Sequence, residues 1–279
     1  MPPRRLRLDA ELVRRGLARS REHAAELVAA GRVTVSGARA GKPATGVTTD
    51  VAIVVVDDPD RPDYVSRGGH KLAGALAAFE PLGLVVAGRR CLDAGASTGG
   101  FTDVLLRAGA REVVAVDVGY GQLAWSIQSD DRVHVHDRTN IRAVTSELIG
   151  GPVDLVVGDL SFISLGLVLE PLIGVTADDG DLALMVKPQF EVGKERLGKG
   201  GVVRDPELRA ETVTAVAERA AALGWGARSV ARSPLPGPSG NVEFFLWLRH
   251  GPSGVDETDI ERVVQGAAQP GAPDGRLGP

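Results

Sequence analysis

The amino-acid sequence predicts an α/β protein in which a mostly parallel sheet carries helices on both faces, preceded by a small basic domain. Three observations support this prediction. From residue 89 onward, strand-like and helix-like segments alternate, and the strand-like ones are almost continuously apolar, as in buried parallel sheets. The first 50 residues hold ten Lys and Arg against five Asp and Glu, a net charge of +5, which leaves −9 for the remainder. A polar stretch with two prolines separates the two regions.

The composition is that of a globular protein with room for one sizeable core and a smaller companion domain: 279 residues, 43% hydrophobic and 24% charged. No apolar run approaches the ~18 residues that span a bilayer, and the N-terminus lacks the apolar segment of a secretory signal. The single cysteine, Cys91, excludes a disulfide framework and a cysteine-rich zinc site, and we expect it to be buried in a strand. We therefore expect a cytoplasmic protein without a metal, monomeric when free.

The basic region is expected to form two short helices followed by strands. Helix-like spacing of leucines predicts helices over Leu8–Arg15 and Ser20–Ala30, the second capped by its first residue and ended by the glycine that follows it. Short strands are predicted at Val33–Val35 and near Val51–Val56. Arginines gather around the turn between the helices, where guanidinium forks suit phosphate oxygens of structured RNA. A merely solvated helix face would carry the same charges.

This region resembles an S4 domain, a small RNA-binding module. The residues that carry the resemblance are Arg7-Leu8-Asp9, Leu12-Val13-Arg14-Arg15-Gly16-Leu17-Ala18-Arg19-Ser20-Arg21, Ala24, Leu27, Gly31-Arg32-Val33, Val35, Gly37 and Lys42-Pro43. The resemblance implies a polymer substrate that is recognised mainly by shape. We expect the S4 domain over residues 4–60 and an interdomain linker over 61–66. The residues expected to contact RNA are Arg4, Arg7, Arg14, Arg15, Arg19, Arg21, Lys42 and Arg67.

The second domain is expected over residues 67–250, with a tail over 251–279 that is disordered at its end. A helix should start at Ser66 or a neighbour and run to about Phe79. The strand-like and helix-like segments that follow are Cys91–Ala94, Phe101–Ala108, Glu112–Asp117, Val133–His136, Val153–Asp159, Leu165–Val175, Asp181–Lys187, Pro206–Leu223 and Val242–Leu248. The turn-rich segment 233–241 predicts a closing hairpin, and thus one antiparallel strand at the sheet edge.

A glycine-rich turn follows the first of these strands and predicts a nucleoside-binding site. Glycines let the backbone pass close to a ligand at the carboxyl edge of the sheet, and carboxylates that end the next two strands can reach ribose hydroxyls and an adenine amino group. A dinucleotide dehydrogenase would share such a turn. The pattern is not Gly-x-Gly-x-x-Gly, however, and a leading Asp suits the methionine end of S-adenosylmethionine better. The candidate cofactor residues are Asp93, Gly95, Ser97, Thr98, Gly99, Phe101, Asp117 and Asp137.

Three further ionisable residues, Asp159, Lys187 and Glu243, lie at the edges of apolar strands on the same rim. A ribose 2′-hydroxyl is a poor nucleophile, so its attack on a sulfonium methyl group is helped by a base and by nearby positive charge. A buried lysine is costly unless it is partnered, and its pKa moves down when it is desolvated. The alternative is a structural ion pair that seals the strand ends.

Lys71, Asp159, Lys187 and Glu243, in this order, match the Lys-Asp-Lys-Glu tetrad of the FtsJ-type 2′-O-ribose methyltransferases. With the S4 domain and the runs Ser66-Arg67-Gly68-Gly69-His70-Lys71-Leu72 and Gly158-Asp159-Leu160-Ser161-Phe162-Ile163-Ser164, the chain resembles the TlyA family from about residue 7 to residue 250. The resemblance implies a Rossmann-like class I methyltransferase fold, with a seven-stranded, mostly parallel sheet whose last strand is antiparallel. It also implies S-adenosylmethionine as cofactor and 2′-O-methylation of cytidine in ribosomal RNA, within one or both ribosomal subunits.

The resemblance implies that Lys187 activates the 2′-hydroxyl, that Asp159 positions Lys187, and that Lys71 and Glu243 complete the tetrad. One departure concerns the linker. Members of the family often carry an Arg and a Trp before the Val-Ser-Arg-Gly run, whereas this chain has Arg61-Pro62-Asp63-Tyr64, with Tyr64 in the place of the aromatic residue.

Other functions remain open at this point. A non-catalytic RNA-binding or ribosome assembly factor would not need a lysine at a buried strand end. A membrane-active haemolysin, a label attached to this family, would need transmembrane or strongly amphipathic segments that the sequence lacks. A base methyltransferase would typically use an Asn/Asp-Pro-Pro-aromatic motif or a catalytic cysteine, and neither is present.

Several other features suggest no function by themselves. The cationic loop Glu191–Gly201 is interpreted either as a lid that closes over RNA or as an ordinary flexible loop. Trp125 and Trp225 are expected to be packing residues. His134 and His136 alternate on a strand without further ligands at metal-binding spacing.

Overall fold

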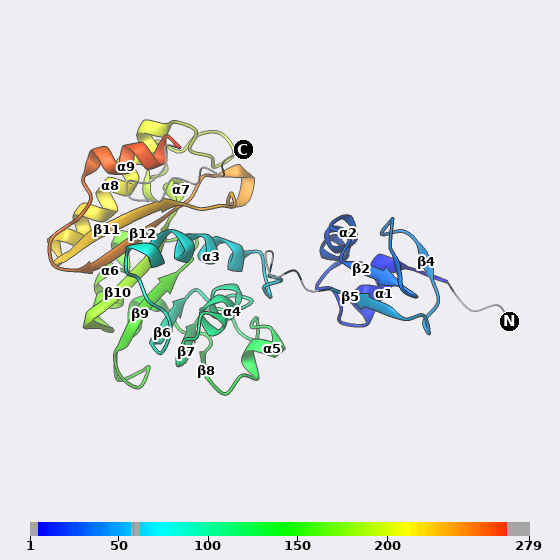
Figure 1. Cartoon of the computed structure of the whole chain (residues 1–279). Coiled ribbons are helices and arrows are strands. Elements are labelled where there is room, and N and C mark those ends of the chain that lie inside the picture. The colour runs from blue at the N-terminus through cyan, green and yellow to red at the C-terminus, as the bar shows by residue number, and fades with distance from the viewer. Residues whose placement is uncertain (1–4, 57, 59–61, 267–279) are drawn as a thin grey trace. The chain divides into compact units, whose positions relative to one another are not determined.

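The structure is a computed structural model and describes residues 5–56, 58 and 62–266. It divides into two compact units, Met1–Asp63 and Tyr64–Pro279 (Figure 1). The predicted linker, residues 61–66, spans this division. Arg4, expected to contact RNA, lies outside the described residues.

Unit 1 is a small α/β domain with its own hydrophobic core. Its elements are β1 (Leu6–Arg7), α1 (Leu8–Arg14), α2 (Arg21–Ala29), β2 (Val33–Val35), β3 (Ala38–Arg39), β4 (Gly46–Val47) and β5 (Ile53–Val55). The two helices pack against the sheet β3-β2-β5 through buried side chains such as Leu8, Leu12 and Leu27. As predicted, Ser20 caps α2, because its hydroxyl accepts a hydrogen bond from the His23 N–H at 3.1 Å.

Unit 2 contains a seven-stranded sheet in the order β11-β12-β10-β9-β6-β7-β8. The strands are β6 (Arg90–Ala94), β7 (Glu112–Val116), β8 (Val133–His136), β9 (Val153–Gly158), β10 (Thr176–Val186), β11 (Trp225–Arg232) and β12 (Phe244–His250). Only β12 runs antiparallel to its neighbours, β10 and β11. The mostly parallel α/β sheet with an antiparallel last strand is therefore confirmed.

The position of the antiparallel strand differs from the prediction. β12 was expected at the sheet edge, but it lies between β10 and β11, because β11 forms the outer half of the hairpin. The residues explain this order. Phe244–Leu248 are buried without interruption, as an inner strand requires, whereas β11 includes Gly226 and shifts register between Ala227 and Ser229, a bulge typical of sheet edges.

Helices cover both faces of this sheet (Figure 1). One face packs against α3 (Gly68–Phe79), α4 (Gly100–Arg107) and α5 (Trp125–Gln128). The other packs against α6 (Leu169–Gly174), α8 (Pro206–Ala222) and α9 (Glu257–Val264). Alternate residues of β9 enter the two cores, Leu155 and Val157 on one side and Val156 on the other. Burial on both faces therefore explains the continuous apolar run.

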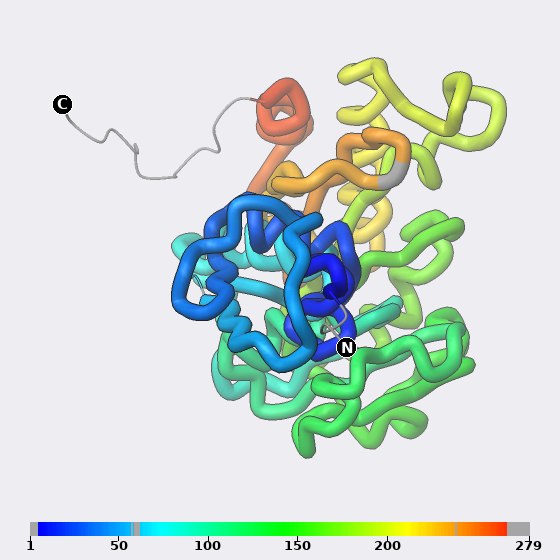
Figure 2. Tube along the Cα trace, turned by 90° about the vertical axis from the view of Figure 1, so that its right-hand side faces the viewer, coloured from blue at the N-terminus to red at the C-terminus, as the bar shows by residue number. Residues whose placement is uncertain are grey.

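One predicted helix and the predicted C-terminal tail differ from the structure. The helix expected over Leu165–Val175 is a 3-10 turn, η3 (Leu165–Leu167), followed by the shorter α6, because Val168 between them has a non-helical φ of −125°. The segment 251–279 is not only a tail. It contains α9, the red helical segment in Figure 2, which begins with a capping box at Asp256 and contacts α8 and β11. The side chains of Ile260 and Val263 are buried. The disorder predicted for the end of this segment falls mostly on residues 267–279, outside the described residues.

The remaining short elements are η1 (Glu80–Leu82), η2 (Ile141–Ala143), α7 (Pro188–Glu191) and η4 (Pro238–Gly240). Across the described ranges, no helix combines the length and the apolar character that crossing a membrane requires.

Candidate active site

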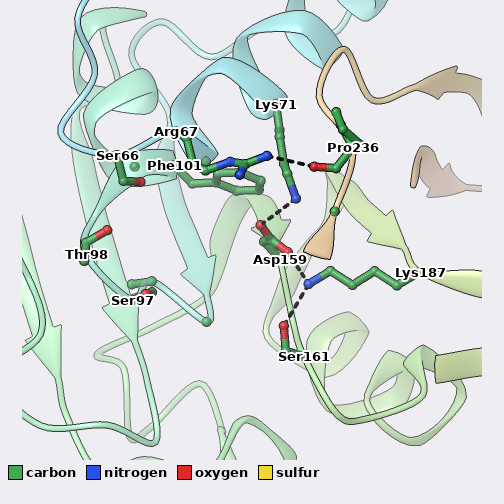
Figure 3. Close-up of a pocket in the computed structure, with 15 residues that line it drawn as sticks. Ser66, Arg67, Lys71, Ser97, Thr98, Phe101, Asp159, Ser161, Lys187 and Pro236 are labelled. Carbon is green, nitrogen blue, oxygen red and sulfur yellow. Dashed lines mark hydrogen bonds and ion pairs between the residues drawn. The ribbon is translucent and has the colours of Figure 1, made fainter. Parts of the chain in front are cut away.

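The candidate site lies at the carboxyl edge of the sheet in unit 2. Ala94 at the end of β6 pairs with Gly158 at the end of β9, and Asp159 and Lys187 follow their strands at this rim. Because β12 is antiparallel, its start reaches the same rim, directly after Glu243. A cavity of about 480 Å³ opens there (Figure 3), lined by Ser66, Arg67, Gly68, Lys71, Gly95, Ala96, Ser97, Thr98, Gly100, Phe101, Asp159, Ser161, Lys187, Pro236 and Gly237.

The four residues of the predicted tetrad lie together beside this cavity. Nζ of Lys187 is 2.5 Å from Oδ1 of Asp159, and Nζ of Lys71 is 3.8 Å from Oδ2 of the same carboxylate. Nζ of Lys71 also donates to Oε2 of Glu243 at 2.5 Å. The result is a continuous chain of alternating charges, Lys187–Asp159–Lys71–Glu243 (Figure 3 draws the first three).

This row of alternating charges stabilises two buried ammonium groups. Lys71, Lys187 and Glu243 are buried, and a buried charge without a partner is strongly destabilising. Two carboxylates balance the two lysines, and Glu243 supports Lys71 from outside the cavity lining. The packing behind Glu243 is tight, because a Cβ at Gly237 would lie 2.1 Å from Oε1 of Glu243.

Sequence reasoning missed the residues around Lys187. Its Nζ donates to the Ser161 hydroxyl at 2.9 Å and lies 5.8 Å from the centre of the Phe190 ring. Phe162, beside Ser161, contacts Phe190 at a ring distance of 5.3 Å but is 91% exposed, with a left-handed φ of 63°. An exposed aromatic side chain on a strained backbone, next to the cavity-lining Ser161, points to a role outside the core.

The predicted glycine-rich turn forms one wall of the cavity. Gly95, Ser97, Thr98 and Phe101 line the cavity, whereas Gly99 does not. Gly95 and Ser97 both have positive φ, at 82° and 48°, so the backbone turns sharply as it leaves β6. The turn therefore exposes backbone groups to a ligand at the carboxyl edge of the sheet.

The three predicted carboxylates at strand ends do not line the cavity, but Asp117 holds a residue that does. Asp117 after β7 accepts hydrogen bonds from the N–H groups of Ser97 at 2.8 Å and Gly119 at 2.7 Å. Asp137 after β8 accepts one from the Gly121 N–H at 2.9 Å. These contacts tie the turn and the loop after β7 to their strands.

Asp93 is completely buried in β6, beneath the turn. The Thr102 hydroxyl donates to its Oδ2 at 2.7 Å, while Oδ1 makes no hydrogen bond within the described part of the chain. Burial raises the pKa of Asp93 to about 7. A carboxyl group held in this state is destabilising for the protein alone, which is typical of functional sites.

The start of α3 forms the opposite wall. The Arg67 guanidinium lines the cavity and donates to the Pro236 carbonyl at 2.9 Å. Tyr64 is buried against Gly69, where a Cβ would approach the Tyr64 side chain to 2.5 Å. Gly69 therefore allows close packing, whereas Gly68 lines the cavity. Tyr64, the aromatic residue expected near the linker, belongs to the core of unit 2.

In unit 1, the arginines expected to contact RNA fall into different environments. Arg7 and Arg21 pair with Asp9, and Arg14 and Arg15 pair with Glu11. Arg15 also donates to the carbonyls of Thr49 and Val51, at 2.9 and 2.7 Å, so it stabilises the fold of unit 1. Lys42 is exposed.

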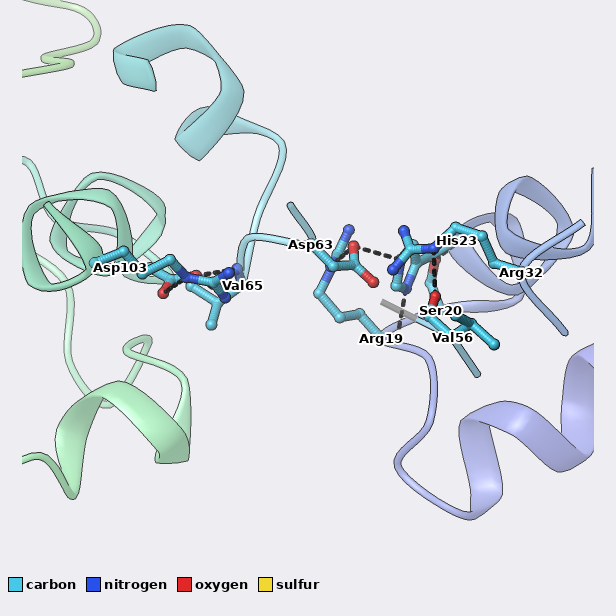
Figure 4. A network of polar contacts seen from close by, with 9 residues as sticks. Arg19, Ser20, His23, Arg32, Val56, Asp63, Val65 and Asp103 are labelled. Carbon is cyan, nitrogen blue, oxygen red and sulfur yellow. Dashed lines mark hydrogen bonds and ion pairs between the residues drawn. The ribbon is translucent and has the colours of Figure 1, made fainter. Parts of the chain in front are cut away.

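Arg19 belongs to a polar network at the end of unit 1 (Figure 4). It donates to Asp63 at 2.9 Å, and Nε2 of His23 lies 2.9 Å from the same oxygen. Because the Arg19 N–H donates to Nδ1 of His23, the ring proton is on Nε2 and faces Asp63. In unit 2, the Val65 N–H donates to Asp103 at 2.9 Å.

The other predicted features have mixed outcomes. Cys91 is buried in β6 and Trp225 is buried, as expected, but the packing role expected for Trp125 is wrong, because its side chain is 79% exposed. Within the described residues, His, Cys, Asp and Glu side chains form no group of three or more that could hold a metal ion. The loop after Glu191 is tied to α8 by an ion pair between Arg196 and Glu211.

Comparison with known proteins agrees with this division of the chain. The profile of the S4 domain matches residues 6–53, and that of the FtsJ-like methyltransferase matches residues 64–250. Over 246 residues the chain is 64% identical to the 16S/23S rRNA (cytidine-2′-O)-methyltransferase TlyA of Mycobacterium tuberculosis, covering 88% of this chain and 90% of that protein. It is also 34% identical to Hemolysin A of Brachyspira hyodysenteriae, over 86% of this chain and 98% of that protein.

Among solved structures, a protein from Streptococcus thermophilus described as a candidate hemolysin aligns with a TM-score of 0.70 and 37% identity, covering 94% of both chains. The FtsJ-like match includes all four residues of the charged chain and the glycine-rich turn. This chain therefore belongs to the FtsJ-like methyltransferase family and carries an S4 domain ahead of the catalytic domain.

Proposed function

We propose that this protein transfers a methyl group from S-adenosylmethionine to the 2′-hydroxyl of a cytidine in ribosomal RNA, within one or both ribosomal subunits. The observation that carries the proposal is the ion pair between Lys187 and Asp159 at the cavity, backed by Lys71 and Glu243. The substrate class is supported by the S4 domain and by the M. tuberculosis relative, whose name gives 16S and 23S rRNA as its substrates.

The cavity suits the cofactor. Its volume of about 480 Å³ lies in the range of small-molecule sites. The turn Gly95–Gly99 offers backbone groups to the methionine portion, and the buried Asp93 beneath it has one oxygen without a hydrogen-bond partner within the described residues. Asp117 holds the turn from the next strand and retains lone pairs for ribose hydroxyls. When bound, S-adenosylmethionine supplies an electrophilic methyl group on a sulfonium.

The tetrad would activate the nucleophile. Nζ of Lys187 would act as the general base and take the proton of the 2′-hydroxyl, so that the 2′-oxygen can bond to the methyl carbon. The electron pair of the methyl–sulfur bond would stay on the sulfur of the cofactor. Lys187 then releases the proton to water. Asp159 keeps Nζ of Lys187 directed at the reacting oxygen, and the Lys71 ammonium contributes positive charge beside the developing alkoxide.

The side chains around the cavity favour ribose over base methylation. Cys91 cannot act as a nucleophile at the rim, because it is buried in β6 and burial raises the pKa of its thiol to about 12. The residues after β9 are Asp159, Leu160 and Ser161, so they lack the Pro-Pro motif that positions an exocyclic amine. A general base next to a cation fits a hydroxyl nucleophile instead.

The test is transfer of labelled methyl groups from S-adenosylmethionine to purified small and large ribosomal subunits that lack the modification. We expect incorporation at a site that becomes resistant to alkaline cleavage, which is diagnostic of a methylated 2′-oxygen. Lys187→Ala and Lys187→Arg are compared with the wild type. Arg keeps the charge beside Asp159 but does not give up its proton near neutral pH, so both variants should bind cofactor and fail to transfer the methyl group.

Two outcomes would contradict the proposal. Activity of Lys187→Arg near the wild-type level would show that Lys187 acts through charge alone. No incorporation into either subunit, despite bound cofactor, would exclude ribosomal RNA in these particles as the substrate. The name of the Brachyspira relative suggests a membrane activity, which release of dye from liposomes by the purified protein would test directly.

A further inference from the structure

One buried carboxylate in unit 1 joins two arginines from different elements. Asp9 lies in the first turn of α1 and is only 4% exposed. Nη2 of Arg7, at the end of β1, donates to its Oδ2 at 2.7 Å, and Nη2 of Arg21, the first residue of α2, donates to the same oxygen at 3.1 Å. Three segments of the chain therefore converge on one side chain.

Asp9 holds these arginines without burying them. The side chains of Arg7 and Arg21 remain 53% and 59% exposed, and most of their N–H donors are not used by Asp9. Arg15 is the contrast within the same domain: its side chain is 22% exposed, and its donors are used by Glu11 and by backbone carbonyls. The Asp9 arrangement thus presents guanidinium groups to the outside, whereas the Glu11 arrangement ties Arg15 into the fold.

The carboxylate itself is fixed and ionised. Oδ1 of Asp9 accepts a hydrogen bond from the Ala10 N–H at 2.7 Å, which anchors the side chain to the helix start. Hydrogen bonding from Arg7 lowers the pKa of Asp9 to about 2, so the negative charge is present at every pH at which the enzyme would work. Without this charge, the two guanidinium groups would repel each other and sample many rotamers.

We propose that Asp9 is a positioning residue for RNA binding: it holds Arg7 and Arg21 as a preformed pair of forks that receive phosphate oxygens of the RNA backbone. The inference rests on the proposed function, because it assumes an RNA substrate. Its physical basis is preorganisation, since ordering two long side chains before binding removes an entropic cost from the binding step. Paired guanidinium forks also match phosphate geometry.

For the effect of Asp9→Asn on RNA affinity, the proposal predicts the opposite sign from simple electrostatics. Asp9→Asn removes one negative charge from an RNA-binding domain and keeps an oxygen for the Ala10 N–H. If Asp9 only neutralised its neighbours, this variant would bind RNA more tightly. If Asp9 positions them, binding should weaken roughly tenfold, the scale of one charge-assisted hydrogen bond. The slope of log affinity against log salt should fall by roughly 1, because one phosphate contact is lost.

The experiment measures the affinity of the full-length protein for the unmodified ribosomal subunit that it methylates, together with the KM and kcat of methyl transfer. For Asp9→Asn we expect a higher KM and an unchanged kcat, since the tetrad lies in unit 2. Glu26→Gln is the matched control: it makes the same charge change at an exposed position of α2, and its affinity should equal or exceed that of the wild type.

A double variant, Arg7→Ala with Arg21→Ala, tests whether Asp9 acts through these two residues. In that background Asp9→Asn should weaken binding no further. If thermal unfolding shows that Asp9→Asn loosens unit 1, Arg21→Lys replaces it as the test. That variant keeps the charge but loses the fork, and it should bind several-fold more weakly at wild-type stability.

Three results would overturn the inference. The first is a folded Asp9→Asn protein that binds the ribosomal subunit as tightly as the wild type or more tightly. The second is a loss of affinity from Asp9→Asn that persists in full when Arg7 and Arg21 are both replaced by Ala. The third is an unchanged affinity of Arg21→Lys for the subunit. Failure of the proposed function is distinguishable from all three, because the wild-type protein would then neither bind nor methylate either subunit.

Discussion

Asp159 contacts both lysines of the tetrad at once: Oδ1 lies 2.5 Å from Nζ of Lys187, and Oδ2 lies 3.8 Å from Nζ of Lys71. The unequal distances distinguish the two lysines. Lys187 has the short contact and also reaches Ser161, whereas Lys71 has its own short contact with Glu243. The geometry therefore suits Lys187 for the reacting position and Lys71 for electrostatic support.

Replacing the shared carboxylate should disable catalysis without removing the cofactor site. In Asp159→Asn, Nζ of Lys187 loses its charged partner and its orientation, so the rate of methyl transfer should fall roughly 100-fold to 10,000-fold, the range for a general base. Single-turnover transfer to ribosomal subunits measures the effect. Ser161→Ala, which removes only the hydroxyl that accepts from Lys187, should lose far less. Equal losses in the two variants would contradict the role assigned to Asp159.

Asp93 should make stability depend on pH in an unusual direction. Burial raises the pKa of Asp93 from 3.8 to about 7, so between these values the folded protein binds more protons than the unfolded chain. Stability contributed by the protonated group is therefore lost as the pH rises through this window. Asp93→Asn removes the effect, and its unfolding temperature should exceed that of the wild type by more at pH 8 than at pH 5. One pKa unit corresponds to about 1.4 kcal/mol, so the gain at pH 8 should reach a few kcal/mol.

Asp130→Asn is a control for this measurement, and its effect on stability should have the opposite sign. Hydrogen bonding from Arg132 lowers the pKa of Asp130, an ion pair that favours the folded state, so Asp130→Asn should be slightly less stable than the wild type at both pH values. If the unfolding temperatures of Asp93→Asn and the wild type changed in parallel with pH, Asp93 would be ionised without a cost in stability.

The affinity for the cofactor should also fall in Asp93→Asn, because the turn Gly95–Gly99 lies directly above this residue.

The exposed ring of Phe162 should matter for the RNA substrate and not for stability. Phe162→Ala removes little buried surface and should leave the unfolding temperature almost unchanged. Loss of a stacking surface for a base next to the reacting ribose should raise KM for ribosomal subunits roughly tenfold, since one base–aromatic stack contributes about 1–3 kcal/mol. Leu148→Ala is the control, because Leu148 is also an exposed apolar residue. It lies away from the cavity: the carbonyl of its neighbour Ile149 accepts a hydrogen bond from Arg90, at the start of β6, whereas the cavity borders the end of β6. Equal KM values for both variants would exclude the stacking role.

Arg15 and Arg21 should respond differently to truncation. Arg15→Ala leaves the buried Glu11 with one partner fewer and deprives the carbonyls of Thr49 and Val51 of a donor, so unit 1 should unfold at a lower temperature. Arg21→Ala should weaken RNA binding with little change in unfolding. Differential scanning calorimetry and subunit binding separate the two effects. A variant of Arg15 that loses only RNA binding would contradict the structural role.

Much of the active site was predictable from the sequence, because the carboxyl ends of parallel strands share one rim. Asp93, Asp117, Asp159 and Lys187 each follow or end an apolar strand, so their approximate location follows from the fold class. Glu243 was placed at the same rim because it opens the last strand, whereas Lys71 was assigned through the resemblance to a known tetrad. Glu243 also illustrates what topology adds, since it reaches the rim only because β12 runs antiparallel to its neighbours.

The features that the sequence did not predict depend on tertiary packing. Nothing local distinguishes Phe162 or Trp125 from core residues, because their exposure is decided by what the neighbouring elements leave uncovered. The antiparallel strand Val242–Leu248 was wrongly placed at the sheet edge, since a hairpin signal does not say which of its two strands is the outer one. The roles of Arg7, Arg15 and Arg21 differ only through their partners, Asp9, Glu11 and distant carbonyls, which no charge count reveals.

The pairing of Lys71 with Glu243 joins residues 172 positions apart. During synthesis, the S4 domain leaves the ribosome first and can fold by its own core, as domains generally do. The charged chain cannot close until β12 has been made and inserted between β10 and β11. A nascent or truncated chain could therefore acquire affinity for RNA long before it acquires the ability to methylate it. Premature termination ahead of Glu243 would yield a competitor of the enzyme that occupies the substrate without modifying it.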